Sequence, residues 1–283
     1  MTLYRGRIAP SPTGHLHVGH ARTFWIAYQR AREAGGVLLL RNDDLDPQRS
    51  KSEYVRAFIE VLRWFGISWH EGPDVGGPFA PYSQSERRSC YLQAWRRLYD
   101  SGMIYPCTCS RKDLQESAGA PHETTNDEPI YPGTCREKTL QAHSPAGVNW
   151  RFRVPDARVV RFDDHAQGPR QFTAGEDFGD FVVWRRDDVP AYQLAVVADD
   201  DAMQITEVVR GCDLLKSTAR QILLCEALGI TPPTYYHCDL LVDETGERLA
   251  KRSDAVSLRA LRARGLTPEE IRTAWLGMKL TGY

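Results

Sequence analysis

Residues 3–40, LYRGRIAPSPTGHLHVGHARTFWIAYQRAREAGGVLLL, decide the fold class of this 283-residue chain. The stretch Leu3–Ile8 predicts a buried strand, and the prolines and glycine of residues 9–14 end it. A helical pattern begins at Val18 and stops at Gly35, and the continuous apolar run Val37–Leu40 is typical of a strand buried on both faces of a parallel sheet. Strand, turn, helix and strand form a βαβ unit, so we expect an α/β fold.

Composition sets limits on partners and compartment. The 36 basic and 37 acidic residues give a net charge of −1, so a nucleic-acid partner must meet a local basic patch. The sequence has no apolar run of about 18 residues and no charged-then-apolar leader, which predicts a soluble, cytoplasmic protein with no membrane partner. An odd number of cysteines, seven, at irregular spacing favours reduced thiols over a disulfide framework.

Beyond residue 40 the pattern divides into four segments. Residues 1–102 read as the first half of a sheet domain, and residues 103–190 as an α+β insertion of short strand-like runs and turns. The α/β pattern resumes in residues 191–253, and residues 254–283 read as C-terminal helices, with a capping box at Thr267–Glu270.

The motif His17-Val18-Gly19-His20 stands at the start of the first predicted helix. Its two imidazoles lie three residues apart, on one face, beside free backbone N–H groups and the positive end of the helix dipole. Such a corner suits phosphate, and Gly19 leaves room for a nucleotide to approach. Two surface histidines at a helix start are the plainer interpretation of this motif alone.

A second motif, Arg248-Leu249-Ala250-Lys251-Arg252, follows a predicted strand in a glycine-containing, charged stretch. Alone, such a run is usually a solvated turn. Placed behind the second half of the sheet, Lys251 could instead reach a triphosphate held by His17 and His20. The two motifs together predict one ATP site built from opposite ends of the chain.

These motifs resemble the HIGH and KMSKS signatures of class I aminoacyl-tRNA synthetases, and four more segments resemble the glutamyl branch of that family. They are residues 7–14, 41–47, 84–87 and 192–211. The resemblance implies a Rossmann-like parallel sheet split by a zinc-bearing insertion, and ATP-dependent activation of L-glutamate with Mg²⁺. It assigns catalysis to His17, His20 and Lys251, and adds Gly19 and Arg252 to the ATP-binding residues.

Glutamate carries two carboxylates and an ammonium group, so its pocket needs guanidinium forks and an acid. Arg7 and Arg210 are the candidate forks, with structural ion pairs as the alternative. The resemblance implies that Asp43 holds the ammonium group, Ser11 lines the pocket and Tyr192 hydrogen-bonds the ligand; a polar turn before Pro47 is the alternative for Asp43. The full expected set is Arg7, Ile8, Ala9, Pro10, Ser11, Asp43, Tyr192 and Arg210.

The sequence departs from the family pattern at several of these positions. Asp43 stands where glutamate is usual, and Asp201 stands where histidine is common. Arg248 and Ala250 replace the first lysine and the serine of the loop signature, leaving Lys251 as its principal cation.

Cys107, Cys109 and Cys135 are spaced for a closed tetrahedral zinc site in an insertion that has few large apolar residues. The resemblance puts Tyr131 in the fourth position, with His122 or water as substitutes. Three unpaired core thiols are the alternative.

The sequence ends about thirty residues after Lys251, whereas glutamyl-tRNA synthetases continue into helical domains that read the anticodon. We therefore expect no anticodon-binding domain. The short plan resembles truncated paralogues that attach glutamate to queuosine in tRNA(Asp), and implies ATP, L-glutamate and that tRNA as partners of a monomer. Three alternatives remain open: charging of a tRNA 3′ end, a nucleotidyltransferase acting on a metabolite, and a non-catalytic binding module.

Overall fold

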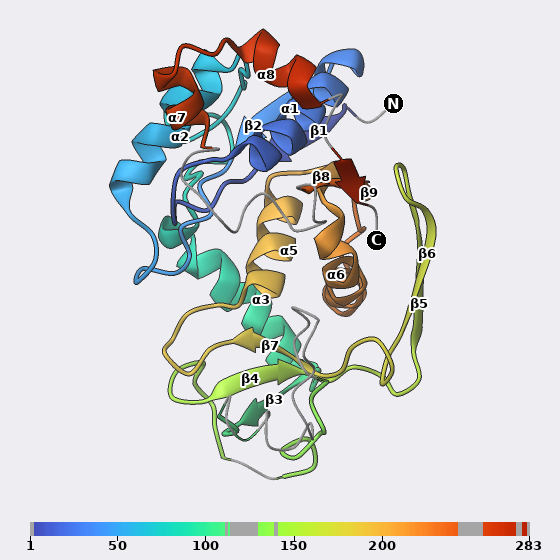
Figure 1. Cartoon of the computed structure of the whole chain (residues 1–283). Helices are drawn as coiled ribbons and strands as arrows, with labels where there is room; N and C mark the ends of the chain where they lie inside the picture. The colour runs from blue at the N-terminus through green and yellow to red at the C-terminus, as the bar shows by residue number, and fades with distance from the viewer. Residues whose placement is uncertain are drawn as a thin grey trace.

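The computed structural model describes residues 3–110, 113, 130–138, 141–242, 257–275 and 279–281. Figure 1 shows a larger sheet flanked by helices at one end of the molecule and a smaller sheet at the other. None of the helices in these described ranges is long and apolar enough to cross a membrane.

The predicted βαβ unit is confirmed. Strand β1 (Arg5–Ile8) is followed by helix α1 (Val18–Glu33) and strand β2 (Val37–Leu40). The two strands pair in parallel, with Ile8 opposite Leu40. Both strands are almost wholly buried, which explains why neither shows polar alternation.

The larger sheet has the strand order β2-β1-β8-β9-β5-β6. Its centre is parallel, because β8 (Glu207–Gly211) pairs in parallel with both β1 and β9 (Thr234–Cys238). The hairpin of β5 (Val159–Asp164) and β6 (Gly168–Thr173) joins it through one parallel pair, Asp164 with Tyr235. Part of the segment 103–190 therefore extends the sheet that it was expected to interrupt, as the long ribbon beside β9 in Figure 1 shows.

The smaller sheet contains β3 (Ile104–Cys107), β4 (Asn149–Phe152) and β7 (Phe181–Trp184), paired antiparallel. Helices α3 (Arg88–Asp100), α5 (Tyr192–Ala202) and α6 (Leu215–Leu228) share one hydrophobic core with it. Trp95 of α3 meets Trp150 of β4 edge to face, with ring centroids 5.1 Å apart. One core thus continues between the two sheets, and the boundaries 102/103 and 190/191 stay predictions.

A second core lies on the other face of the larger sheet. Helix α2 (Ser52–Trp64) and the C-terminal helices α7 (Leu258–Ala263) and α8 (Pro268–Trp275) contribute to it together with α1 (Figure 1). The predicted capping box is present, since Thr267 Oγ1 accepts from the Glu270 N–H and Glu270 Oε2 accepts from the Thr267 N–H.

The expectation of C-terminal helices alone was incomplete. A short strand, β11 (Lys279–Thr281), pairs antiparallel with β10 (Leu240–Val242). Its partner strand comes from an earlier part of the chain, which a local sequence pattern does not reveal.

Candidate active site

A cavity of about 530 Å³, here called the sheet-end cavity, opens where β1 and β8 end and α1 begins. In open parallel sheets, ligands bind outside the carboxyl ends of the strands. Ten of the sequence-predicted ATP and glutamate residues line it. They are Arg7, Ala9, Pro10, Ser11, His17, Gly19, His20, Asp43, Tyr192 and Arg210.

Three predicted residues are not placed at this cavity. Ile8 is fully buried and packs in the hydrophobic core of the sheet. Lys251 and Arg252 lie outside the described residues.

The two predicted histidines lie together at the start of α1. Their ring centroids are 3.7 Å apart, and the ring of His20 stacks on Phe24 at 6.2 Å. His17 is the N-cap of the helix, and its Nδ1 accepts from the Gly19 N–H at 3.1 Å. That bond fixes the tautomer of His17 and leaves Nε2–H as a donor.

Gly19 also has a structural role at the start of α1, and its expected role of leaving room for a nucleotide stays a prediction. A Cβ atom there would come within 3.1 Å of His17 Cε1, so the glycine makes room for the capping imidazole. Burial lowers the pKa of His17, and desolvation followed by the charge of His17 lowers that of His20. Both rings are therefore neutral hydrogen-bonding groups at pH 7.

Arg210 is a buried cation, 5% exposed, in the wall of the cavity. Its guanidinium donates to Thr218 Oγ1 at 2.7 Å, to His237 Nε2 at 3.1 Å and to Tyr192 Oη at 3.4 Å. No carboxylate lies within ion-pair distance of it among the described residues, so the structural ion pair considered for Arg210 is not seen there. A buried cation without an anion is a site for an anionic ligand.

Arg7 is also 5% exposed and lies 3.4 Å from Asp200. It belongs to a buried group of charges centred on Arg41, which sequence reasoning did not single out. Arg41 Nε contacts Asp43 at 2.6 Å, and its Nη1 contacts Asp200 at 2.6 Å. Asp199 joins the group at 3.8 Å from Arg41 Nε and also pairs with Arg87 at 2.6 Å.

Asp43, the residue expected to hold the ammonium group, is thus already paired with a cation. Burial raises the pKa of Asp43 to about 6 despite the neighbouring Arg41. An ammonium group bound against Asp43 would favour the ionised carboxylate.

The segment that contains Lys251 starts and ends near this cavity. Strand β10, which contributes Leu240 and Leu241 to the lining, ends at Val242. The described chain resumes at Ser257, which forms an antiparallel bridge with His17, and the Leu258 N–H donates to Leu16 O at 2.8 Å.

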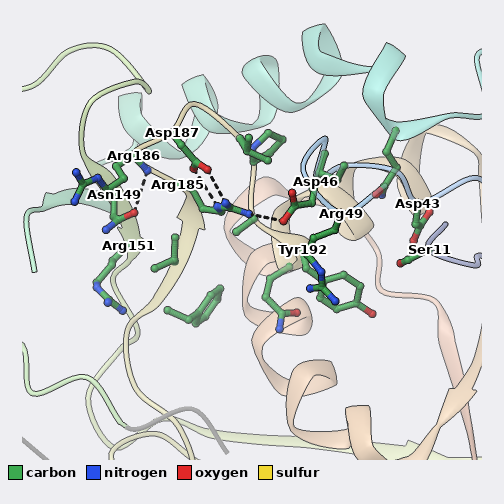
Figure 2. A pocket seen from close by; sticks show the side chains of 18 of the residues that line it. Ser11, Asp43, Asp46, Arg49, Asn149, Arg151, Arg185, Arg186, Asp187 and Tyr192 are labelled. Atoms are coloured by element: carbon green, nitrogen blue, oxygen red, sulfur yellow. Dashed lines mark hydrogen bonds and ion pairs between the residues drawn. The ribbon is translucent and has the colours of Figure 1, made fainter. Parts of the chain in front are cut away.

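A larger cavity of about 850 Å³, here called the inter-sheet cavity, shares Ser11, Thr13, Asp43 and Tyr192 with the sheet-end cavity. Figure 2 shows Ser11, Asp43 and Tyr192 on one side and Asn149 and Arg151 of the smaller sheet on the other. Between them, Arg185 binds Asp46 at 3.2 Å and Asp187 at 2.5 Å (Figure 2).

Two further arginines of the inter-sheet cavity, Arg49 and Arg186, are exposed. Within the described part of the chain, their guanidinium groups have no hydrogen-bond or ion-pair partner. They give this cavity an unneutralised positive charge that an anionic ligand would match.

The three predicted cysteine ligands converge at one end of the inter-sheet cavity, where Cys109 lines the wall. The sulfur atoms of Cys107, Cys109 and Cys135 all lie within 4.8 Å of one another. Tyr131 Oη lies 3.4 Å from Cys107 Sγ and 3.5 Å from Cys109 Sγ, and it accepts from the Cys135 N–H at 2.8 Å. His122, the substitute considered for Tyr131, lies outside the described residues.

Hydrogen bonding favours one thiolate in this cluster. Burial alone would raise the pKa of Cys135, but hydrogen bonds from the Thr108 backbone and from Tyr131 outweigh it and lower the pKa to about 6. Arg151 supports the cluster by donating to Cys107 Sγ at 3.3 Å and lying 3.9 Å over the Tyr131 ring. The alternative of three unrelated core thiols does not account for this convergence.

Comparisons with known proteins identify the family of this chain. The catalytic-domain model of the class I tRNA synthetases (E and Q) matches residues 4–281. The chain is 48% identical to the glutamyl-Q tRNA(Asp) synthetase of Nitratidesulfovibrio vulgaris over 98% of this chain and 86% of that protein. It is also 48% identical to the protein of that name from Symbiobacterium thermophilum, over 94% of this chain and 83% of that protein.

Among solved structures, the glutamate-tRNA synthetase of Elizabethkingia anophelis matches with a TM-score of 0.78 and 30% identity. The match covers 94% of this chain and 54% of that one. The family match thus includes all of the described residues that line the two cavities. This protein belongs to the class I tRNA synthetases of the glutamate and glutamine (E and Q) branch, as a member of their catalytic-domain family.

Proposed function

We propose that this enzyme activates L-glutamate with ATP and transfers it to the queuosine base of tRNA(Asp). Two relatives that are glutamyl-Q tRNA(Asp) synthetases by name, each 48% identical over nearly the whole chain, support this substrate pair. The observation that carries the glutamate assignment is Arg210, a buried guanidinium in the sheet-end cavity with no described carboxylate partner.

In the first step, a carboxylate oxygen of glutamate attacks the α-phosphorus of ATP, and the bond to the leaving pyrophosphate breaks. The α-carboxylate is already ionised at pH 7, so the step needs no general base. Arg7 and Arg210 bind the carboxylates, Asp43 binds the ammonium group, and the Tyr192 hydroxyl hydrogen-bonds the ligand. Catalysis is then positioning and stabilisation of charge.

The phosphate contacts are assigned to both predicted motifs. The neutral rings of His17 and His20 donate hydrogen bonds to phosphate oxygens, beside the N-terminus of α1. Lys251 and Arg252 bind the departing pyrophosphate. Mg²⁺ carried by ATP supplies further neutralisation of phosphate charge.

A glutamate-dependent ATP–pyrophosphate exchange assay without tRNA tests the first step. We expect exchange with L-glutamate and none with L-glutamine or L-aspartate, because the pocket pairs two guanidinium groups with two carboxylates at a defined separation. Exchange that does not depend on glutamate would overturn the assignment.

In the second step, a hydroxyl of the queuosine cis-diol attacks the glutamyl carbonyl, the bond to AMP breaks, and the adenylate phosphate accepts the proton. The acceptor nucleoside must lie next to the glutamate. We place it in the inter-sheet cavity, which meets the sheet-end cavity at Ser11, Asp43 and Tyr192. A volume of about 850 Å³ is within the usual range for ligand sites.

Removing the guanidinium groups of Arg49 and Arg186 should affect the transfer step and leave glutamate activation unchanged. We expect Arg49→Ala combined with Arg186→Ala to raise the KM for tRNA by about tenfold and to leave pyrophosphate exchange unchanged, because each guanidinium meets a phosphate of the RNA. The log–log slope of that KM against salt should fall by about one for each arginine replaced. Arg63→Ala is the matched control. It removes an exposed arginine of α2 that pairs with Asp74 and does not line the inter-sheet cavity.

The cysteine cluster fits zinc. A tetrahedral site with Zn–S bonds of about 2.3 Å places sulfur atoms about 3.8 Å apart, and a phenolate oxygen at about 2.0 Å lies about 3.5 Å from each sulfur. The observed distances are 3.6 Å between Cys109 Sγ and Cys135 Sγ, and 3.4 and 3.5 Å from Tyr131 Oη to two of the sulfurs. We therefore assign one structural zinc to Cys107, Cys109, Tyr131 and Cys135, where it would hold the smaller sheet to the segment after Ile130.

The purified enzyme should accordingly contain one zinc per chain by elemental analysis. We expect Cys135→Ser to lose the metal and Tyr131→Phe to bind it more weakly, because each removes one ligand. Cys90→Ser, which alters a half-buried thiol on α3, should keep the full metal content. Metal-free protein that is as stable to heat as the zinc-loaded protein would contradict a structural role.

A further inference from the structure

Arg210 is oriented by a chain of hydrogen bonds that enters from the β5–β6 hairpin. Asp164, the last residue of β5, accepts from His237 Nδ1 at 2.5 Å, and His237 Nε2 accepts from Arg210 Nε at 3.1 Å. All three side chains are buried: Asp164 is 4% exposed, His237 0% and Arg210 5%. The chain passes from β5 through β9 to β8 and ends in the sheet-end cavity.

The direction of these bonds depends on the tautomer of His237. Arginine only donates, so His237 can accept from Arg210 only if its Nε2 carries a lone pair. The proton must then be on Nδ1, where the Asp164 carboxylate accepts it. Thr218 Oγ1, 3.1 Å from His237 Nε2, also accepts from Arg210 Nη2.

Burial keeps His237 neutral. Burial lowers the pKa of His237 to about 4, because desolvation and the positive charge of Arg210 outweigh the hydrogen bond to Asp164. Burial would raise the pKa of Asp164, but hydrogen bonds from His237 and the Gln167 backbone hold it at about 2. Asp164 is therefore an anion that fixes a neutral imidazole.

We infer that Asp164 and His237 are positioning residues that orient Arg210 toward a carboxylate of glutamate. This inference rests on the proposed function. Nε and Nη2 of Arg210 are held inside the protein by His237 and Thr218, and Nη1 remains on the side of Tyr192 and the cavity. The hairpin of the segment 103–190 thereby acts on the amino-acid site.

Asp164→Asn tests the tautomer. Asp164 Oδ1 accepts from the backbone N–H groups of Ala166, Gln167 and His237 at 3.0, 2.8 and 3.1 Å. An asparagine would keep its carbonyl oxygen toward these three donors and turn its NH₂ group toward His237 Nδ1. His237 would then carry its proton on Nε2, against the Nε–H of Arg210, and the guanidinium would turn away.

We expect Asp164→Asn to raise the KM for glutamate in pyrophosphate exchange by at least tenfold, with the KM for ATP within twofold of the original. Imidazole ¹⁵N spectra should show His237 protonated on Nδ1 in the unaltered enzyme and on Nε2 in the variant. His237→Gln, which keeps an acceptor near Arg210 Nε, should bind glutamate better than His237→Leu, which has none.

Gln167→Ala is the matched control. It removes the side-chain bonds of Gln167 to His237 O at 3.0 Å and to Asp239 Oδ1 at 2.7 Å but leaves the chain from Asp164 to Arg210 intact. A merely structural role of the hairpin would change the glutamate KM equally in Gln167→Ala and Asp164→Asn, and would overturn the inference.

Protonation of His237 on Nε2 in the unaltered enzyme would overturn the inference as well. Failure of the unaltered enzyme to exchange with glutamate would instead refute the proposed function. The imidazole ¹⁵N spectra report the tautomer of His237 whether or not the enzyme shows exchange with glutamate.

Discussion

Replacing His20 with alanine should lower the rate of glutamate-dependent pyrophosphate exchange by roughly 10²–10³-fold, the scale for losing one preorganised donor to a transition state. His17 and His20 are held with ring centroids 3.7 Å apart at the start of α1, where backbone N–H groups and the helix dipole favour phosphate. The loss should appear in kcat, because charge on the reacting phosphate grows on the way to the transition state.

The pH profile separates neutral donors from imidazolium cations. Desolvation lowers the pKa of both histidines, and that of His20 to about 3, so His20 is already neutral at pH 8 and stays neutral as the pH falls toward 6. We expect kcat to show no rise over that interval. A rise on acidification that disappears in His20→Ala would contradict the neutral assignment.

A substitution at a histidine outside the site separates the loss of a phosphate donor from a general loss of folding. His143→Ala removes an exposed imidazole that contacts Tyr99, away from the lining of both cavities, and should leave exchange unchanged. His17→Gln should retain part of the activity, because glutamine keeps an N–H donor. If His20→Ala catalyses exchange at the rate of the unaltered enzyme, the proposed role of the histidine pair in binding phosphate is wrong.

Lys251→Ala should reduce exchange by about 10²-fold or more, because its ammonium group neutralises the departing pyrophosphate. The described chain supports this position on both sides of the segment. Strand β10 leads into it from the cavity wall, and Ser257, six residues after Lys251, bridges His17.

Lys251→Arg should recover part of the lost rate, because it restores the charge. Arg262→Ala is the matched control, since it removes an exposed arginine of α7 that binds Glu60 and does not line the sheet-end cavity. If Lys251 stabilises the departing pyrophosphate, Lys251→Ala should lower kcat and leave the KM for glutamate unchanged. Exchange by Lys251→Ala within twofold of the original enzyme would refute it.

Local pattern predicted the elements that depend on local physics. The apolar run Val37–Leu40 is a strand with those bounds, and the capping box at Thr267 opens α8 one residue later. The motif His17–His20 predicted a phosphate corner because helix starts expose N–H groups wherever they occur. Spacing also predicted the cysteine cluster, whereas Tyr131 came only from the family resemblance.

Features that depend on tertiary contacts were not predictable in this way. Arg41 looks like any charged residue after a strand, yet it is fully buried because three aspartates converge on it from two segments. Asp164 and His237 lie 73 residues apart and carry no motif. The pairing of β5 with β9 brings Asp164 to His237, and the pairing of β8 with β9 places His237 opposite Arg210.

The same reason applies to β6 and β11, two of the strands that were not predicted. Strand β6 is a polar, partly exposed partner of β5, and β11 has only three residues. Neither has the alternation or apolar run from which a strand is predicted. Their pairing partners, not their own sequences, make them strands.

Transfer of radiolabelled glutamate tests the central claim most directly. The enzyme is given ATP, L-glutamate and purified tRNA(Asp), either carrying queuosine or carrying guanosine at that position, and the label is followed after periodate treatment of the tRNA. Periodate oxidises free cis-diols, at the queuosine base and at the 3′ terminus. We predict that only the queuosine tRNA is labelled. Oxidising the 3′-terminal diol of this tRNA, with the diol of the queuosine base protected from periodate, should leave the labelling unchanged. Labelling of both tRNAs, abolished by oxidation of the 3′ terminus, would contradict the account and show a synthetase that charges the 3′ end.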